Sequence, residues 1–269
     1  MPTEETFKPN NLVQTIERVS SILDILGQSS QGISIGELST AINLPKGTTH
    51  RLLSSLAYFG YVRQDPKTRN YFLGLKFVEL GQILLQQLDL RKEAEPFLRD
   101  LADRTKETVH LVILDRNEVV YIDKLETDQN PSGLKMASRI GLRNPAHSSA
   151  VGKVILSHFS EEELEGFLLE KGLGKRTENT ITDPTQLKEH LKSVRKQGYA
   201  IDDEENEKGI RCVAAPIYNE AGRVVAAMSI SSPAFRATKK VIQESLKKEV
   251  METALKVSQR LGFKRNRDQ

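Results

Sequence analysis

The 269-residue chain has a single cysteine, Cys212, so no disulfide can form within it. This scarcity favours a reducing compartment, because proteins that rely on disulfides carry several cysteines. No apolar run approaches the roughly 20 residues that cross a bilayer as a helix. The N-terminus also has no basic segment followed by an apolar one, as a signal peptide would. We therefore expect a soluble, cytoplasmic protein with no membrane partner.

The chain also lacks the usual sequence patterns of catalytic and metal sites. No GxSxG nucleophile motif is present. The stretch HSSAVGK departs from a phosphate-binding loop, because His147 and Val154 stand where Gly and Ser or Thr are required. Five scattered histidines and one cysteine give no zinc-binding spacing, and DDEENEKG (202–209) lacks the spacing of a calcium loop. We therefore expect no enzymatic activity, no metal site and no cofactor.

Positive charge is concentrated in one segment, although the net charge of the whole chain is only +3. Between residues 44 and 76 there are six basic side chains and a single acidic one, Asp65. Such a local excess is typical of a nucleic-acid-binding surface, and it also occurs on ordinary solvated faces. Charge alone therefore leaves both interpretations open.

The same segment belongs to a predicted pattern of three helices followed by a β-hairpin. Apolar residues recur at helical spacing from 12 to 26, and Ser34 with Glu37 forms a capping box for a second helix. Pro45 favours the start of a third helix, LPKGTTHRLLSSL (44–56), whose first turns are polar and whose later turns are apolar. The turn DPKTRN then separates two short strand-like stretches.

A helix with polar donors at its start and an apolar face behind them fits a recognition helix in the major groove of DNA. The hairpin after it fits a wing that contacts phosphates or the minor groove. The alternative is a solvated helix end and loop with ordinary surface charge. We predict a winged helix-turn-helix that binds double-stranded DNA through Lys46, Thr48, Thr49, His50, Arg51, Lys67 and Arg69.

The rest of the chain alternates between helical and strand patterns. Helices are predicted at about 75–90, 91–106, 148–158, 160–171, 183–197 and 238–261. Strands are predicted for VHLVILD, VVYIDKL, LKMAS, YAID, IRCVAAPIY and VVAAMSIS. Runs of strands with helices between them favour an α+β domain with an antiparallel sheet over a parallel βαβ array.

The stretch SIGELSTAINLPKGTTHRLLSSLAYFGYVRQDPKTRNYFLGLKFVELG resembles the winged helix-turn-helix and linker helix of the IclR family of bacterial transcriptional regulators. Three later stretches, RIGLRNPAHSSAVGKVILSHFS, QGYAIDDEENEKGIRCVAAPIY and AAMSISSP, are similar to the effector-binding domain of that family. The resemblance runs in order through about residues 10–262. It implies a DNA-binding domain at 10–74, a linker helix at 75–91 and a GAF-like, IclR-type effector-binding domain at 92–269.

The resemblance also implies a homodimer or homotetramer that binds a near-palindromic operator and a small-molecule effector. We expect a repressor, while activation and the choice between dimer and tetramer stay open. The family's effector pocket maps onto Met136, Ala150, Val151, Asp202, Ile210, Cys212, Ser229 and Ser231. Where the family has a Gly-Ala pair, this chain has the larger Ala150 and Val151, which predicts a smaller pocket.

The pocket residues also support a ligand site by their own chemistry. Ser229 and Ser231 are two apart on a predicted strand, so their hydroxyls share one face and need partners if they are buried. Free N–H groups at a helix start near 148–150 suit a carboxylate, so a small organic acid is the expected effector. Alternatively, the serines bind each other or water and Cys212 is a small core residue. A redox- or metal-responsive thiol is a further alternative, although Arg211 should point away from Cys212.

Overall fold

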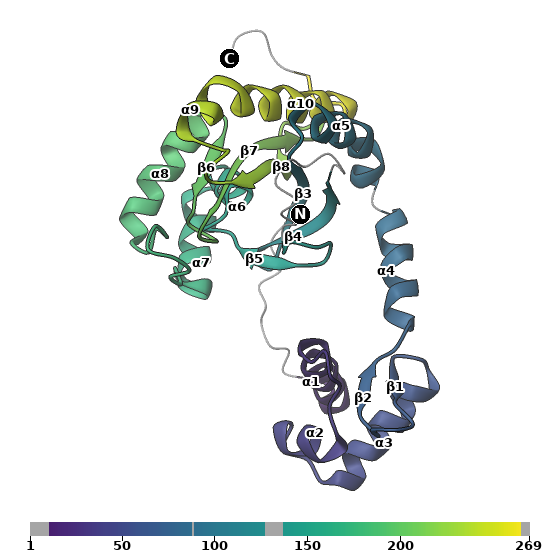
Figure 1. Ribbon diagram of the computed structural model, residues 1–269. Helices are drawn as coiled ribbons and strands as arrows, with labels where there is room; N and C mark the ends of the chain where they lie inside the picture. Colours follow the sequence, from purple (N-terminus) through teal and green to yellow (C-terminus); the bar gives the residue numbers. More distant parts are fainter. Residues whose placement is uncertain (1–10, 88, 127–136, 265–269) are drawn as a thin grey trace. The chain divides into compact units, whose positions relative to one another are not determined.

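The computed structural model describes residues 11–87, 89–126 and 137–264 of the chain. Contacts between residues divide the chain into two compact units, Met1–Gln87 and Leu88–Gln269, which are coloured purple to blue and blue to yellow in Figure 1. Among the described residues, no helix is long and apolar enough to cross a membrane.

The first unit contains three helices, a two-stranded antiparallel hairpin and a fourth helix (Figure 1). Its elements are α1 (Gln14–Gln28), α2 (Ile35–Ala41), α3 (Lys46–Tyr58), β1 (Val62–Gln64), β2 (Tyr71–Leu73) and α4 (Lys76–Gln87). The capping box predicted for the second helix is present, because the Ser34 hydroxyl accepts from the Glu37 N–H while the Glu37 carboxylate accepts from the Ser34 N–H. Side chains from α1, α2, α3 and both strands form a small core around Ile22, Leu38 and Leu53.

The second unit is built on one six-stranded antiparallel sheet with the strand order β5-β4-β3-β8-β7-β6. Its strands are β3 (Thr108–Asp115), β4 (Glu118–Leu125), β5 (Arg143–Pro145), β6 (Ala200–Asp203), β7 (Ile210–Tyr218) and β8 (Val224–Pro233). Its helices are α5 (Asp89–Thr105), α6 (Ala150–Leu156), α7 (Glu161–Lys171), α8 (Pro184–Gln197), α9 (Lys239–Val241), the π-helical turn η1 (Ile242–Leu246) and α10 (Lys247–Arg260).

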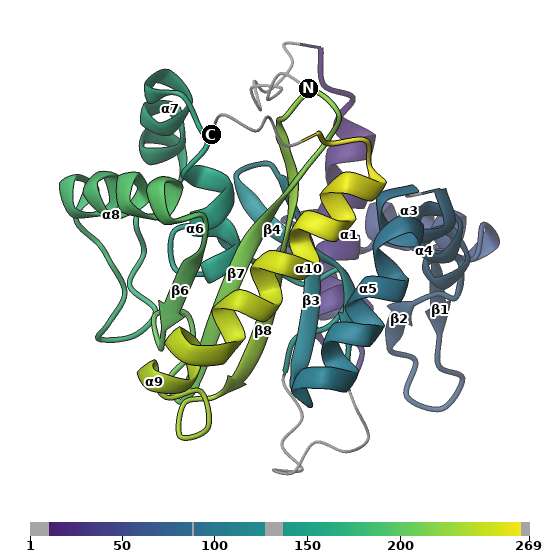
Figure 2. The same ribbon diagram turned by 90° about the horizontal axis from the view of Figure 1, so that it is seen from above.

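Helices cover both faces of this sheet, so the unit has two apolar cores. On one face α5 and α10 lie across the strands, as Figure 2 shows, and Met228 and Ile230 of β8 pack beneath them. On the other face α6, α7 and α8 pack on a second core that includes Ala227, Ala214 and Val154. Because side chains alternate along a strand, β8 presents Ser229 and Ser231 to the α6 side of the sheet.

The predicted α+β fold with an antiparallel sheet is confirmed, and the details differ in three places. The sequence pattern of 143–145 gave no strand signal, yet it pairs with β4 as the edge strand β5. The final helix is interrupted by the π-helical turn at 242–246. The candidate strand LKMAS falls largely outside the described residues, and its last two residues, Ala137 and Ser138, are not in a strand.

Candidate functional site

The first turns of α3 expose polar side chains and free backbone donors. Pro45 is the N-cap and provides no side-chain hydrogen bond to the helix, so the N–H groups of the first turn have no capping partner. Lys46, His50 and Arg51 are exposed, and Thr48 is half-buried. Leu53 and Leu56, further along the helix, are buried in the core. Four of the five predicted recognition residues are therefore accessible to a partner.

Thr49 is the exception, and its assignment to the DNA-contacting set is wrong. Its side chain is 0% exposed, and its hydroxyl donates to the Pro45 carbonyl at 3.2 Å. It lies four and seven residues before Leu53 and Leu56, so all three share the inward face of the helix. Thr49 is a packing residue of this unit.

The predicted wing is the exposed turn between β1 and β2. Asp65 organises it, because its carboxylate accepts hydrogen bonds from the N–H groups of Lys67 (2.9 Å) and Thr68 (2.8 Å). Arg69 adopts a left-handed backbone conformation with φ of 62°. Lys67 and Arg69 are both exposed. Two cations thus project from a turn whose backbone is fixed by local hydrogen bonds.

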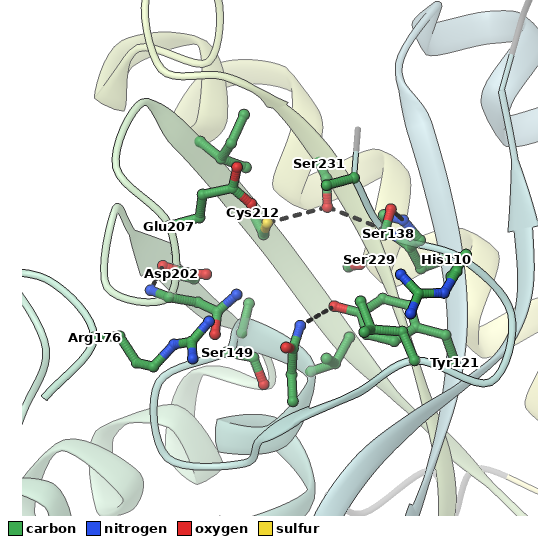
Figure 3. A pocket seen from close by; sticks show the side chains of 18 residues that line it. His110, Tyr121, Ser138, Ser149, Arg176, Asp202, Glu207, Cys212, Ser229 and Ser231 are labelled. Atoms are coloured by element: carbon green, nitrogen blue, oxygen red, sulfur yellow. Dashed lines mark hydrogen bonds between the residues drawn. The ribbon is translucent and has the colours of Figure 1, made fainter. Parts of the chain in front are cut away.

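The second unit contains a cavity of about 240 Å³ on the α6 side of the sheet, shown in Figure 3. Seven of the eight predicted effector residues line it, namely Ala150, Val151, Asp202, Ile210, Cys212, Ser229 and Ser231. The eighth, Met136, lies outside the described residues. The volume is slightly below the usual range for small-molecule pockets, which limits the size of any molecule that the cavity could hold.

Helix α6 forms one wall of this cavity, and all seven of its residues are buried. The Ser149 hydroxyl caps the helix by accepting from the Gly152 N–H at 3.2 Å. A Cβ on Gly152 would lie only 2.2 Å from the carbonyl oxygen of Ala146. Glycine at this position therefore lets the start of α6 pack directly against the preceding backbone.

A chain of hydrogen bonds runs along the opposite wall from Ser138 to Cys212. The Ser231 hydroxyl donates to Cys212 Sγ (3.0 Å), so its oxygen must accept from His110 Nδ1 (3.3 Å). His110 Nε2 then accepts from the Ser138 hydroxyl (2.8 Å). Burial, assisted by the nearby Lys124, lowers the pKa of His110 to about 3. The imidazole is therefore neutral, and this wall carries donors and acceptors without a charge.

Ser229 differs from Ser231 because its hydroxyl has no hydrogen-bond partner among the described residues. It is 3% exposed and lines the cavity (Figure 3). Buried hydroxyl groups in proteins nearly always have a partner, whether protein, water or ligand. Ser229 thus marks a position where a bound molecule would gain a hydrogen bond.

Asp202 is a buried carboxyl group at the third side of the cavity. It is 3% exposed, and its Oδ1 accepts from the N–H groups of Glu205 (2.7 Å) and Asn206 (3.2 Å). Burial raises its pKa to about 7, against the opposing effect of Lys153. Lys153 is itself fully buried and paired with Glu205. Asp202 is therefore a carboxyl group that changes protonation near neutral pH.

Cys212 is in an environment that opposes the hypothesis of a redox-sensing thiol. Burial and the neighbouring Asp202 carboxyl group raise the pKa of its thiol, whereas reactive thiols need a depressed pKa. Arg211 points away as predicted, since its guanidinium pairs with Asp203 and Glu204. If oxidant leaves DNA affinity unchanged, that hypothesis can be abandoned.

Several cavity residues were not found from the sequence. They are His110, Tyr121, Ala137, Ser138, Arg139, Leu142, Asn144, Ser149, Arg176, Asn206 and Glu207. The Tyr121 hydroxyl accepts from the Asn144 side chain at 3.2 Å, and burial raises the pKa of Tyr121 to about 12. The sequence signal for this group is the polar His110 within the apolar strand VHLVILD. Like the serines of β8, a histidine buried on such a strand needs a hydrogen-bond partner.

Comparison with known proteins places both units in one family. The model described as "IclR helix-turn-helix domain" matches residues 15–66, and "Bacterial transcriptional regulator IclR C-terminal" matches residues 82–259. The transcriptional regulator KdgR of Escherichia coli is 38% identical over 264 residues, which are 98% of each protein. The acetate operon repressor of Salmonella typhimurium is 36% identical, covering 88% of this chain and 86% of that protein.

A solved structure with the same fold holds a small ligand. It is an IclR homologue from Microbacterium hydrocarbonoxydans complexed with 4-hydroxybenzoate. The match has a TM-score of 0.78 at 25% sequence identity and covers 92% of this chain and 98% of that one. Matched in both units and aligned to its relatives over nearly its whole length, the chain belongs to the IclR family of DNA-binding transcriptional regulators.

Proposed function

We propose that this regulator is a repressor whose binding to a near-palindromic operator is modulated by a small organic acid in the cavity of the second unit. The observation that carries the proposal is Ser229, a buried residue whose hydroxyl lines the cavity and has no hydrogen-bond partner among the described residues. Repression is supported by the similarity to the acetate operon repressor. The sensor role is supported by the 4-hydroxybenzoate complex of a structural neighbour.

On the DNA side, the proposal assigns base contacts to the start of α3 and backbone contacts to the wing. Thr48, His50 and Arg51 present donors and a methyl group at the depth of the major groove, and Lys46 approaches a phosphate near the free N–H groups. Lys67 and Arg69 contact phosphates or the minor groove. Two such units in a homodimer or a dimer pair would contact the two halves of the operator.

On the ligand side, charge and size favour a small acid. Arg139 and Arg176 contribute two cations to the cavity lining against the carboxylate of Glu207, and the raised pKa of Asp202 lets that carboxyl group stay neutral beside an anion at pH values below about 7. The neutral wall formed by Ser229, Ser231 and Cys212 suits hydroxyl or carbonyl oxygens of the same molecule. A molecule with a carboxylate and further polar oxygens could pair with the arginines and also hydrogen-bond to this wall.

The coupling between ligand and DNA is assigned to the linker helix at 75–91. Ligand contacts with β8 and the start of α6 would favour one arrangement of the second unit, and the linker helix would carry that change to the DNA-binding unit. Specific binding depends on the spacing of two recognition helices, so a small reorientation costs several kcal/mol. The effector thereby shifts the fraction of protein bound to the operator. The size of the shift depends on how much more tightly the effector binds one arrangement of the second unit than the other.

The first experiment is to incubate the protein with sheared genomic DNA at physiological salt and to sequence the retained fragments. Enrichment of one near-palindromic site upstream of a few genes is expected, and the enzymes encoded there nominate the effector. Uniform retention at every salt concentration would contradict a specific regulator.

A variant then separates sensing from DNA binding. Ser229→Ala should bind the enriched operator like the wild type and lose the response to the nominated acid. Ser258→Ala is the control, because Ser258 is a buried serine on α10 whose hydroxyl donates to the Ala254 carbonyl and accepts from the Tyr218 N–H, away from the cavity. Loss of operator binding in Ser229→Ala without effector would instead give Ser229 a structural role.

A further inference from the structure

Arg176 is a cation directed at the cavity without a carboxylate partner among the described residues. Its side chain lines the cavity, and in Figure 3 its guanidinium points toward Ser149 and Asp202. The adjacent Lys175 is different, because its ammonium pairs with Glu178 at 2.8 Å and does not line the cavity. A guanidinium that faces a cavity and has no internal counter-ion is available to an anionic ligand.

The backbone that carries Arg176 is fixed in place by side-chain hydrogen bonds. The Arg176 N–H donates to Thr180 Oγ1 (3.0 Å), and that hydroxyl donates to the Glu205 carbonyl (2.7 Å). The Thr177 hydroxyl donates to the Glu204 carbonyl at 2.7 Å. Glu204 and Glu205 closely follow Asp202, so these bonds tie the segment of Arg176 to the cavity wall. A fixed backbone lowers the entropy lost when the side chain pairs with a ligand.

Much of the wall that faces this segment is uncharged, although the carboxylate of Glu207 also lines the cavity. His110 is neutral and its hydrogen bonds run through Ser231 to Cys212. Ser229 is buried, and its hydroxyl has no partner in the part of the chain that the structure describes. The cavity is therefore asymmetric, with the Arg176 guanidinium on one side and, on the other, neutral hydroxyl and thiol groups next to the Glu207 carboxylate.

We propose that Arg176 is a specificity-determining residue that pairs with the carboxylate of the effector and sets its orientation, with the remainder of the molecule against the β7–β8 wall. This rests on the proposed function as a sensor of small acids. A charged hydrogen-bonded pair in a cavity is stronger than a neutral one. The pocket should consequently prefer an acid over its neutral amide by about tenfold to a hundredfold.

The test measures binding of matched acids and amides to the full-length protein by calorimetry. The probes are 4-hydroxybenzoate with 4-hydroxybenzamide, and a panel of short aliphatic hydroxy and keto acids, each with its amide. In Arg176→Gln the affinity for the acid should fall by about tenfold to a hundredfold while the affinity for the amide is unchanged. Arg176→Lys should restore part of the preference, because it keeps the charge and loses the planar fork.

Two further variants make the assignment specific. Lys175→Gln removes a neighbouring cation outside the cavity and should leave the preference intact. Arg139→Gln removes the other cavity arginine and should change the preference less than Arg176→Gln. Thermal unfolding of each variant shows that the fold is retained.

The outcomes separate this inference from the proposed function. If Arg176→Gln keeps the preference for acids, or if only Arg139→Gln loses it, the role of Arg176 is overturned while acid sensing stands. If the wild type binds none of the acids, both the inference and the proposed acid effector fall.

Discussion

Two helices of this chain begin with similar polar sequences, PKGTTHR at the start of α3 and HSSAVGK at the start of α6, and their environments are opposite. At α3 the side chains of Lys46, His50 and Arg51 are exposed, and no side chain caps the helix. At α6 every residue of the helix is buried and Ser149 caps it. One start is open to a macromolecule, and the other is enclosed around a small cavity.

The difference shows where polar groups need partners within the chain. The donors at the start of α3 are exposed to solvent, so they need no partner from the surrounding sequence. The polar groups around α6 have lost water, and each needs an internal partner. Lys153 has one in Glu205, which is 52 residues away, whereas Ser229 has none among the described residues. Ser229 lines the cavity, so a bound molecule could supply the partner that the described part of the chain does not.

The largest effect is expected where a buried pair is broken. Lys153→Met removes the charge that pairs with the buried Glu205 and should lower the free energy of unfolding by about 3–5 kcal/mol. Lys188→Met is the control, because the Lys188–Glu165 pair lies at the surface and contributes at most about 1 kcal/mol. Urea denaturation measures both variants. Equal losses in the two variants would show that the buried pair contributes no more to the free energy of unfolding than the surface pair does.

A somewhat smaller effect is expected from the protonation of Asp202. Its pKa in the fold is raised from an ordinary value of 3.8 to about 7 by burial, with Glu205 adding to the rise and Lys153 opposing it. The folded state therefore holds a proton that the unfolded state loses between these values. Its stabilising contribution is complete below about pH 4 and is lost as the pH rises through about 7.

Asp202→Asn removes that dependence and identifies it. The difference in unfolding free energy between wild type and variant should change by on the order of 2–4 kcal/mol between pH 4 and pH 7, with the wild type losing stability relative to the variant. Asp183→Asn, an exposed helix cap, is the control. A pH-independent difference for Asp202→Asn would mean that the folded carboxyl group titrates at its ordinary value.

The contrast between the two helix starts also shows what the sequence can predict. Repeats of apolar residues identified nearly every helix and strand, and the alternation along β8 placed Ser229 and Ser231 on one face. The spacing of Thr49 from Leu53 and Leu56 predicts that it is buried with them. The prediction of a DNA contact relied instead on its polar hydroxyl. Local sequence patterns predict the environment of a side chain where that environment is set by the helix or strand that carries it.

The cavity residues that were not predicted depend on contacts between distant segments. His110 lies opposite Ser229 because β3 pairs with β8. Its hydrogen-bond partner Ser231 is 121 residues away in the sequence. Arg176 lies in a segment without a helix or strand and reaches the cavity through Thr177 and Thr180 bonded to the β6–β7 connection. No periodicity within either segment carries this information, so only the assembled sheet reveals it.

At the exposed helix start, Arg51 should affect specificity and the wing should affect affinity. Arg51→Ala should weaken operator binding by about 1–3 kcal/mol and binding to random DNA much less, because a base contact is lost. Lys67→Ala should weaken both to a similar degree and flatten the salt dependence, because a phosphate contact is lost. Titrations on both DNAs at several salt concentrations distinguish them. Equal losses on both DNAs for Arg51→Ala would remove it from the base-contacting residues.

The smallest effect separates two neighbouring threonines at this helix start. Thr49→Val keeps the buried volume and removes a hydroxyl bonded to Pro45, so it should lower stability by about 1 kcal/mol and leave base preference unchanged. Thr48→Val removes a hydroxyl from the half-buried position beside it, so it should change the preference at one base pair and leave stability nearly unchanged. Selection from a randomised operator library measures preference, and urea denaturation measures stability. Altered base preference in Thr49→Val would return Thr49 to the recognition surface, because a fully buried side chain influences bases only if the helix start rearranges on DNA.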